Sequence, residues 1–440
     1  RSHFGSSNTF ANLLHKPPPA SAAHGGPAGL MDDYKVVRRI AEGRFGTVFE
    51  ACKLSTGQQV AIKKIRARRP PPGYTQDPWS KSAEREIEVL GSVTHDHVLS
   101  LIDHMVPPGG MTTLLVYEYL AWDLATVLER SLPMAEEHIK ATLQMLFLGL
   151  AHLHSRSVMH RDLKPANLLL DGTSGILKIA DFGSSRFSPE PRQGTEDARR
   201  PLENAVEGGN ELPGLLTREV CTRWYKSPEM LFGSVDYTLS VDLWAAGCVA
   251  SELMSPEGKP LFPGNSDLEQ LCLIFQTRGT PREDEWPDVC HLPDYSKVEF
   301  KARDPQEFEF HDRRSTAAVG LAYELLQLTP QRRMQAADAL EQDFFKTSPP
   351  PAQPHELVQG LGRPANAREQ PETPSDVSPL HECDYGSDDS CLGCSQTEFE
   401  PVDIETTTCG LWDDVALSSA GREGEVDEPR EQSGRRTPPP

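Results

Sequence analysis

The stretch His160-Arg161-Asp162-Leu163-Lys164-Pro165-Ala166-Asn167, followed by Asp181-Phe182-Gly183, decides the fold of this chain. It sets two carboxylates, a lysine and an amide at short spacing. Phosphoryl transfer needs such a set, because a protein must orient a hydroxyl, hold Mg²⁺ on the phosphates and neutralise charge as it develops. The candidate catalytic residues are therefore Asp162 and Lys164, and the candidate metal ligands are Asn167 and Asp181.

Segments suited to a nucleotide precede this stretch. Residues 40–48 (Ile-Ala-Glu-Gly-Arg-Phe-Gly-Thr-Val) lie between two predicted strands, and their glycines let backbone N–H groups approach phosphates. Lys63 ends the apolar run Val60-Ala61-Ile62 and is expected to hold the α- and β-phosphates. Its expected partner is Glu86, on a helix predicted from about Ser80 to Leu90. Glu84 and Glu88 on the same helix compete for that role.

In this order the motifs resemble those of eukaryotic protein kinases, and residues 217–229 (Thr-Arg-Glu-Val-Cys-Thr-Arg-Trp-Tyr-Lys-Ser-Pro-Glu) resemble the cyclin-dependent-kinase branch, in the CMGC group. Met31-Asp32-Asp33-Tyr34 and residues 267–272 point within it to the cell cycle-related kinase subfamily. The resemblance covers roughly residues 34–346. It implies an α+β, bilobal protein-kinase fold with a β-rich N-lobe containing one main helix, a mostly helical C-lobe, and ATP and Mg²⁺ as cofactors.

The resemblance also divides the chain. Pro, Gly and acidic residues dominate both the long segment before Thr217 and the C-terminal region, a composition with too few apolar residues to offset the entropy of ordering. The predicted parts are a disordered extension (1–30), an N-lobe (31–119), a C-lobe (120–346) with an activation-segment insertion (187–216), and a disordered tail (347–440).

Family membership implies roles for further residues. The backbones of Glu118 and Leu120 would bond adenine in a hinge, with Tyr117 as the gatekeeper. Asp123 would contact the ribose, although capping the helix before Leu124 explains it almost as well. The other residues expected around ATP are Ile40, Ala41, Gly43, Gly46, Val48, Ala61 and Leu169.

The same resemblance predicts a phosphorylation switch at Thr217. A phosphate there needs several guanidinium partners, and the chain offers Arg85, Arg161 and Arg186 from three separate segments. Thr222 would bond to the catalytic Asp162 and Lys164. The expected structural residues are Asp242 and a buried ion pair between Glu229 and Arg333.

Three positions depart from the family pattern. Ala41 stands where the phosphate loop usually has glycine. Phe45 stands where cell-cycle members carry a tyrosine that is phosphorylated to inhibit them, so that control is expected to be absent. Lys226 replaces an arginine that helps to accept a proline after the target residue.

Composition excludes several function classes. The chain of 440 residues has a net charge of −21, and the segment 347–440 alone has 19 acidic and 6 basic residues. Such acidity argues against nucleic-acid binding and anionic membrane surfaces, and no apolar run could span a bilayer. The nine irregularly spaced cysteines suggest a reducing compartment, so we expect the cytoplasm or nucleus.

The sequence thus predicts a serine/threonine kinase. Its expected partners are Ser/Thr-containing protein substrates, a cyclin or cyclin-like activator and an upstream activating kinase. The subfamily implies cell-cycle or cilium-length control and phosphorylation of other kinases' activation loops. One alternative is a kinase that activates transcription-cycle cyclin-dependent kinases, and another is a pseudokinase scaffold. A zinc site at Cys391 and Cys394 is a weaker hypothesis, because a second ligand pair is missing.

Overall fold

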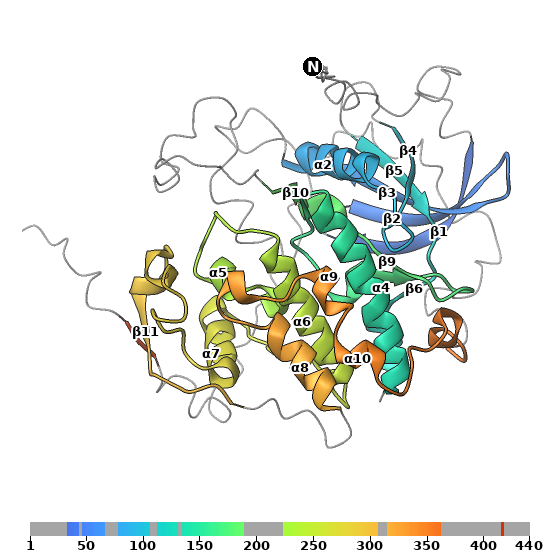
Figure 1. Ribbon diagram of the computed structural model, residues 1–440. Coiled ribbons are helices and arrows are strands. Elements are labelled where there is room, and N and C mark those ends of the chain that lie inside the picture. The colour runs from blue at the N-terminus through green and yellow to red at the C-terminus, as the bar shows by residue number, and fades with distance from the viewer. Residues whose placement is uncertain are drawn as a thin grey trace, which may run out of the picture.

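The computed structural model describes residues 33–43, 46–66, 78–105, 112–130, 134–188, 223–306, 315–361 and 415–417. A sheet with one covering helix lies above a larger, mainly helical part (Figure 1). The predicted α+β bilobal architecture is therefore confirmed.

The upper lobe is a five-stranded antiparallel sheet in the order β1-β2-β3-β5-β4. Successive side chains of a strand point to opposite faces, so Val60 and Ile62 of β3 join one buried cluster while Ile65 joins another. The second cluster includes Val89 and Leu90, which belong to the helix α2 (Pro78–Ser92). The strands are β1 (Tyr34–Gly43), β2 (Gly46–Lys53), β3 (Gln59–Arg66), β4 (Leu101–Met105) and β5 (Thr112–Glu118).

Two long helices form the centre of the lower lobe. In α4 (Glu136–Ser155), apolar residues recur at steps of three and four, and this stripe is buried, as the 3.6-residue period requires. Every residue of α6 (Ser240–Met254) is buried, in agreement with its apolar character on all sides. No helix in the described stretches is both long and apolar enough to cross a membrane. The other helices are α3 (Leu124–Arg130), α5 (Pro228–Leu231), α7 (Asp267–Arg278), α8 (Thr316–Leu325), α9 (Ala336–Ala339) and α10 (Asp343–Lys346).

Short strands carry the chemistry-bearing segments between the lobes. The strands β6 (Trp122–Asp123), β8 (Leu168–Leu170) and β9 (Leu177–Ile179) form one sheet, whereas β7 (Val158–Met159) pairs with β10 (Arg186–Phe187). The stretch 160–167 runs from β7 to β8, and Asp181 follows β9. Single 3₁₀ turns are η1 (Pro165–Asn167), η2 (Phe182–Ser184), η4 (Arg223–Tyr225), η5 (Val289–His291), η6 (Tyr295–Lys297), η7 (Pro330–Arg332) and η8 (Pro354–Leu357).

The predicted start of the disordered tail is wrong. Residues 347–361 pack against the lower lobe: the Lys140 ammonium donates to the carbonyls of Thr347 and Pro349, both at 2.8 Å. Leu357 and Leu361 are buried in the main core. Although the segment is rich in proline, the burial of Leu357 and Leu361 and the hydrogen bonds from Lys140 keep it packed against the lobe. Farther along the predicted tail, β12 (Val415–Leu417) pairs with β11 (Val298–Phe300).

Candidate active site

A buried lysine and two carboxylates meet between the lobes. Lys63 Nζ donates to Glu86 Oε2 and to Asp181 Oδ1, each at 2.9 Å. Burial alone would lower the pKa of Lys63, but the charges of Asp181 and Glu86 outweigh it and raise that pKa. Burial likewise would raise the pKa of Asp181, and Lys63 outweighs it and lowers that pKa. Lys63 and Asp181 are therefore charged at neutral pH. Lys63 pairs with Glu86, as expected, whereas Glu84 and Glu88 on the same helix are exposed.

Neighbouring side chains fix the position of Glu86. Its Oε1 accepts a hydrogen bond of 2.6 Å from the Tyr117 hydroxyl, and the residue is 1% exposed. One turn earlier on α2, Ser82 Oγ donates to the Gly183 carbonyl at 2.8 Å. A Cβ on Gly183 would lie 2.8 Å from that Oγ. Sequence reasoning missed both contacts, although the four-residue spacing of Ser82 and Glu86 already places them on one helix face.

The second cluster lies on the segment 160–167. Lys164 Nζ donates to Asp162 Oδ2 at 3.0 Å, and the Asn167 side-chain amide donates to both Asp162 Oδ2 and the Asp162 carbonyl, at 3.1 and 2.7 Å. Burial raises the pKa of Asp162, and Lys164 offsets part of that rise. The structure thus places one buried carboxylate within hydrogen-bonding distance of a cation and an amide.

Asp242 of α6 fixes the backbone of this segment through hydrogen bonds. Its two oxygens accept hydrogen bonds from the backbone N–H groups of His160 (2.8 Å) and Arg161 (2.7 Å), and His154 Nε2 lies 3.1 Å away. Arg161 has φ 67°, a left-handed conformation that costs a non-glycine residue free energy. The fully buried Asp242 supplies the interactions that keep the backbone there. The His160 ring, 2.9 Å from the Ala180 carbonyl, links this segment to the one that carries Asp181.

The predicted metal ligands suit a hard cation. Because Asn167 donates through its amide nitrogen to two acceptors, its side-chain carbonyl oxygen is directed elsewhere. Asp181, held at φ 64°, uses Oδ1 for Lys63, and Oδ2 accepts no hydrogen bond from the described residues. One amide oxygen and one carboxylate oxygen are the donors that Mg²⁺ prefers. These residues therefore fit the metal that the sequence assigned to them.

The residues expected around a nucleotide lie on facing elements. Ala41, Val48 and Lys63 are in register across β1, β2 and β3. Ala61, Leu120 and Leu169 pack against the main core with part of their surface exposed, as the lining of a cleft would. The remaining members are Ile40 and Gly43 on β1, Gly46 (φ 138°) at the start of β2, and Glu118 at the end of β5.

The Asp123 carboxylate caps the helix α3. Its carboxylate accepts hydrogen bonds from the backbone N–H and the hydroxyl of Thr126, both at 2.9 Å, at the first turn of α3. This is the helix cap that the sequence offered as the alternative to a ribose contact. The Glu118 carboxylate, for its part, is held by Lys178 at 2.9 Å.

Three arginines lie on adjoining segments. Arg85 is on α2, Arg161 follows β7, and Arg186 is opposite Met159 in the pair of β10 with β7. Arg161 Nε donates to the Ser184 carbonyl at 2.6 Å, which ties the catalytic stretch to the start of the activation segment. Thr217 and Thr222 lie outside the described residues, as do Arg44, Phe45 and the tail cysteines.

The predicted ion pair of Glu229 with Arg333 is present and buried. The guanidinium nitrogens Nη1 and Nη2 lie 2.6 and 2.7 Å from the two carboxylate oxygens. Arg333 also donates to the carbonyls of Ser240, Gln327 and Leu328. This network ties the end of the activation segment to α6 and η7.

Comparison with known proteins agrees with this geometry. Residues 34–345 match the model of the protein kinase domain family. Cyclin-dependent kinase 20 of Homo sapiens is 39% identical over 340 residues, which are 76% of this chain and 90% of that protein. The Danio rerio protein of the same name is 39% identical over 358 residues (80% and 95%). Cyclin-dependent kinase D-1 of Oryza sativa subsp. japonica is 35% identical over 342 residues (77% and 73%). The chain therefore belongs to the protein kinase family, in its cyclin-dependent-kinase branch.

Proposed function

We propose that this protein is an active serine/threonine kinase that transfers the γ-phosphoryl group of ATP with Mg²⁺. The observation that carries the proposal is the pair of clusters described above. Lys63, Glu86 and Asp181 form one, and Asp162 with Lys164 forms the other. Buried charges cost free energy unless they are paired, and here two carboxylates converge on Lys63 while Lys164 donates to Asp162, which matches the set of groups that phosphoryl transfer needs.

In this mechanism Asp162 accepts or orients the proton of the substrate hydroxyl. Lys164, 3.0 Å from that carboxylate, stabilises the transferring phosphoryl group. Asn167 and Asp181 would hold Mg²⁺, which supplies charge neutralisation on the phosphates when bound. Lys63, kept in place by Glu86, positions the phosphates.

Phosphorylation of Thr217 is the proposed switch. Arg85, Arg161 and Arg186 lie on segments that adjoin one another. The proposed phosphate would bind these guanidinium groups, and each new charge-assisted hydrogen bond would order the activation segment. The proposed regulators are an upstream kinase and a cyclin or cyclin-like activator.

The proposed substrates are proteins with Ser-Pro or Thr-Pro sites, or the activation loops of other kinases. We place this activity in cell-cycle or cilium-length control, in the cytoplasm, the nucleus or the cilium. Activation of transcription-cycle cyclin-dependent kinases is the alternative.

A peptide-array experiment tests the reaction class. Full-length protein is incubated with Mg²⁺, ATP and arrayed Ser/Thr peptides, and the native chain is compared with Thr217→Ala. We expect phosphorylation biased to Ser/Thr-Pro, and at least a tenfold loss in Thr217→Ala. Equal activity of the two proteins would refute the switch, and phosphorylation without regard to the following proline would refute the specificity.

A binding measurement separates the enzyme from the scaffold. Mg²⁺-ATP is expected to raise the melting temperature of the native protein, because a ligand that binds only the folded state stabilises it. The Asp181→Asn variant should lose most of the Mg²⁺-dependent part of that rise. No shift in the native protein would favour the scaffold.

A further inference from the structure

The strand β11 of the lower lobe has a partner from the far end of the chain. It pairs antiparallel with β12, with Val298, Glu299 and Phe300 opposite Leu417, Ala416 and Val415. Among the described residues, these two strands form a sheet of their own. Residues 362–414 separate β12 from Leu361, the last described residue of the core before it.

The edge that β11 offers is built independently of β12. The Phe300 ring lies perpendicular to that of Phe275 on α7, with the ring centres 4.8 Å apart. Just beyond β11, the Arg303 carbonyl accepts from the Thr280 N–H at 3.1 Å, and the Arg303 N–H donates to the Thr280 hydroxyl at 3.0 Å. These contacts hold β11 extended, so the backbone edge that it presents to β12 would be a ready template for a strand even without β12.

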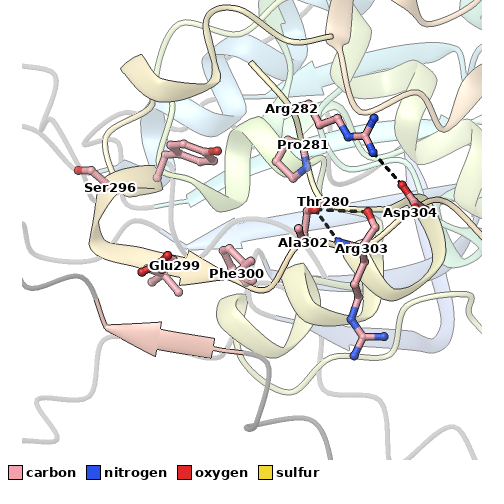
Figure 2. A pocket seen from close by; sticks show the side chains of 11 residues that line it. Thr280, Pro281, Arg282, Ser296, Glu299, Phe300, Ala302, Arg303 and Asp304 are labelled. Atoms are coloured by element: carbon pink, nitrogen blue, oxygen red, sulfur yellow. Dashed lines mark hydrogen bonds and ion pairs between the residues drawn. The ribbon is translucent and has the colours of Figure 1, made fainter. Parts of the chain in front are cut away.

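The surface beside β11 is hollowed. A cavity of about 630 Å³ adjoins β11. In Figure 2, Phe300 and Glu299 lie on one side of it and Thr280, Pro281 and Arg303 on another, and the tail strand runs alongside β11. Extended peptides commonly bind in this manner, with main-chain hydrogen bonds supplying affinity and adjacent hollows supplying specificity.

Charge favours the tail as the occupant. In the sequence, Asp413 and Asp414 directly precede β12, and Lys301 and Arg303 follow β11. The antiparallel register pairs Phe300, which Lys301 follows in the sequence, with Val415, which Asp414 precedes in the sequence. The pairing has only three residues on each strand, and short two-stranded pairs are marginal in water. Attachment to the same chain raises the local concentration of the segment, so a weak contact can still form.

We propose that β11 and the adjoining hollow are a docking site for an extended acidic segment, and that the chain's own tail occupies it through Val415–Leu417. The tail thereby tethers itself to the lower lobe and closes this edge to similar segments of other proteins. The inference does not depend on the proposed catalytic activity.

Hydrogen exchange of the full-length protein tests the docking. Ala416→Pro is expected to disrupt the strand pairing, because proline removes a backbone N–H and restricts φ. The matched control is Ala420→Pro, the same substitution outside β12. We expect the amides of Val298–Phe300 to exchange at least about fivefold faster in Ala416→Pro, and at the native rate in Ala420→Pro. An unchanged rate in Ala416→Pro would overturn the proposal.

A peptide and a charge swap identify the occupant. A fluorescent peptide of residues 409–420 should bind Ala416→Pro at least tenfold more tightly than it binds the native chain, whose site is occupied. Lys301→Glu should weaken that binding, and the Asp414→Lys peptide should restore it. Equal binding to both proteins would overturn the occupancy by the tail.

The dependence of hydrogen exchange on protein concentration separates one chain from two. If the exchange rate of Val298–Phe300 in the native protein depended on protein concentration, the strand would come from a second copy, and docking within one chain would be overturned.

Discussion

Replacement of Arg333 by methionine should strongly destabilise the folded protein. Arg333 is 2% exposed and its partner Glu229 is 3% exposed. Methionine keeps much of the volume but removes both charge-assisted hydrogen bonds, at 2.6 and 2.7 Å, and leaves the carboxylate buried without a counter-charge. Breaking a buried pair in this way costs about 3–5 kcal/mol. Folded domains have a total free energy of unfolding of about 5–15 kcal/mol.

Differential scanning calorimetry of the full-length protein measures this cost. At about 2–4 °C per kcal/mol, the figure for domains of about 150–250 residues, the expected fall in melting temperature is about 6–20 °C. The matched control is Arg39→Met, which removes an ion pair of the same length with Glu42, but one whose side chains are 62% and 63% exposed. That control should cost less than about 1 kcal/mol.

A double variant separates the lost attraction from the stranded charge. Glu229→Leu combined with Arg333→Met removes the unpaired carboxylate and should be more stable than Arg333→Met alone by about 1–3 kcal/mol. If Arg333→Met and Arg39→Met melted at the same temperature, the buried ion pair would not contribute more to the free energy of unfolding than the exposed one, and the prediction would be refuted.

Three further predictions concern the charged groups. Glu86→Gln weakens the hold on the lysine and should lower kcat/KM for ATP at least tenfold, whereas the exposed Glu88→Gln on the same helix should change it less than twofold in the same steady-state assay. Lys164→Met removes the cation that lowers the pKa of Asp162, so that pKa should rise. The acid limb of the variant's residual pH–rate profile should therefore lie at higher pH than in the native enzyme. An unmoved limb would exclude Asp162 as the titrating group. Burial raises the pKa of Glu252 to about 7, so the folded protein binds this proton more tightly than the unfolded chain, and stability should fall by up to about 3 kcal/mol as pH rises through 4.5–7. Glu252→Gln should remove that part of the pH dependence of the melting temperature, and identical pH profiles of native and variant proteins would contradict it.

The chemistry-bearing residues were predictable from sequence because phosphoryl transfer demands particular residue types at short spacing. Asp162, Lys164 and Asn167 lie within six residues of one another, so a local pattern contains most of their geometry. The pairing of Lys63 with Glu86 needed more. The choice of Glu86 over Glu84 and Glu88 followed from the resemblance of Arg85-Glu86-Ile87 to the corresponding helix of cyclin-dependent kinases, because the apolar residues of the helix indicated only which side is buried.

Contacts between distant segments were not predictable in the same way. The hydrogen bond from Tyr117 to Glu86 and the one from Ser82 to Gly183 join segments whose approach depends on the whole fold. The ordered stretch 347–361 was missed because its composition is that of a linker. A proline-rich segment becomes ordered when the folded surface offers it partners, here Lys140 and an apolar site for Leu357.

The most direct test of the central claim is the transfer of phosphate from labelled ATP to a Ser-Pro peptide. Three full-length proteins are compared: the native chain, Asp162→Asn, and Asp171→Asn, which changes a carboxylate in the turn between β8 and β9. We predict that Asp162→Asn lowers the rate about 10²–10⁴-fold, the usual effect of a lost general base, and that Asp171→Asn stays within about twofold of the native protein. Equal rates for all three proteins would show that the phosphorylation does not come from this site.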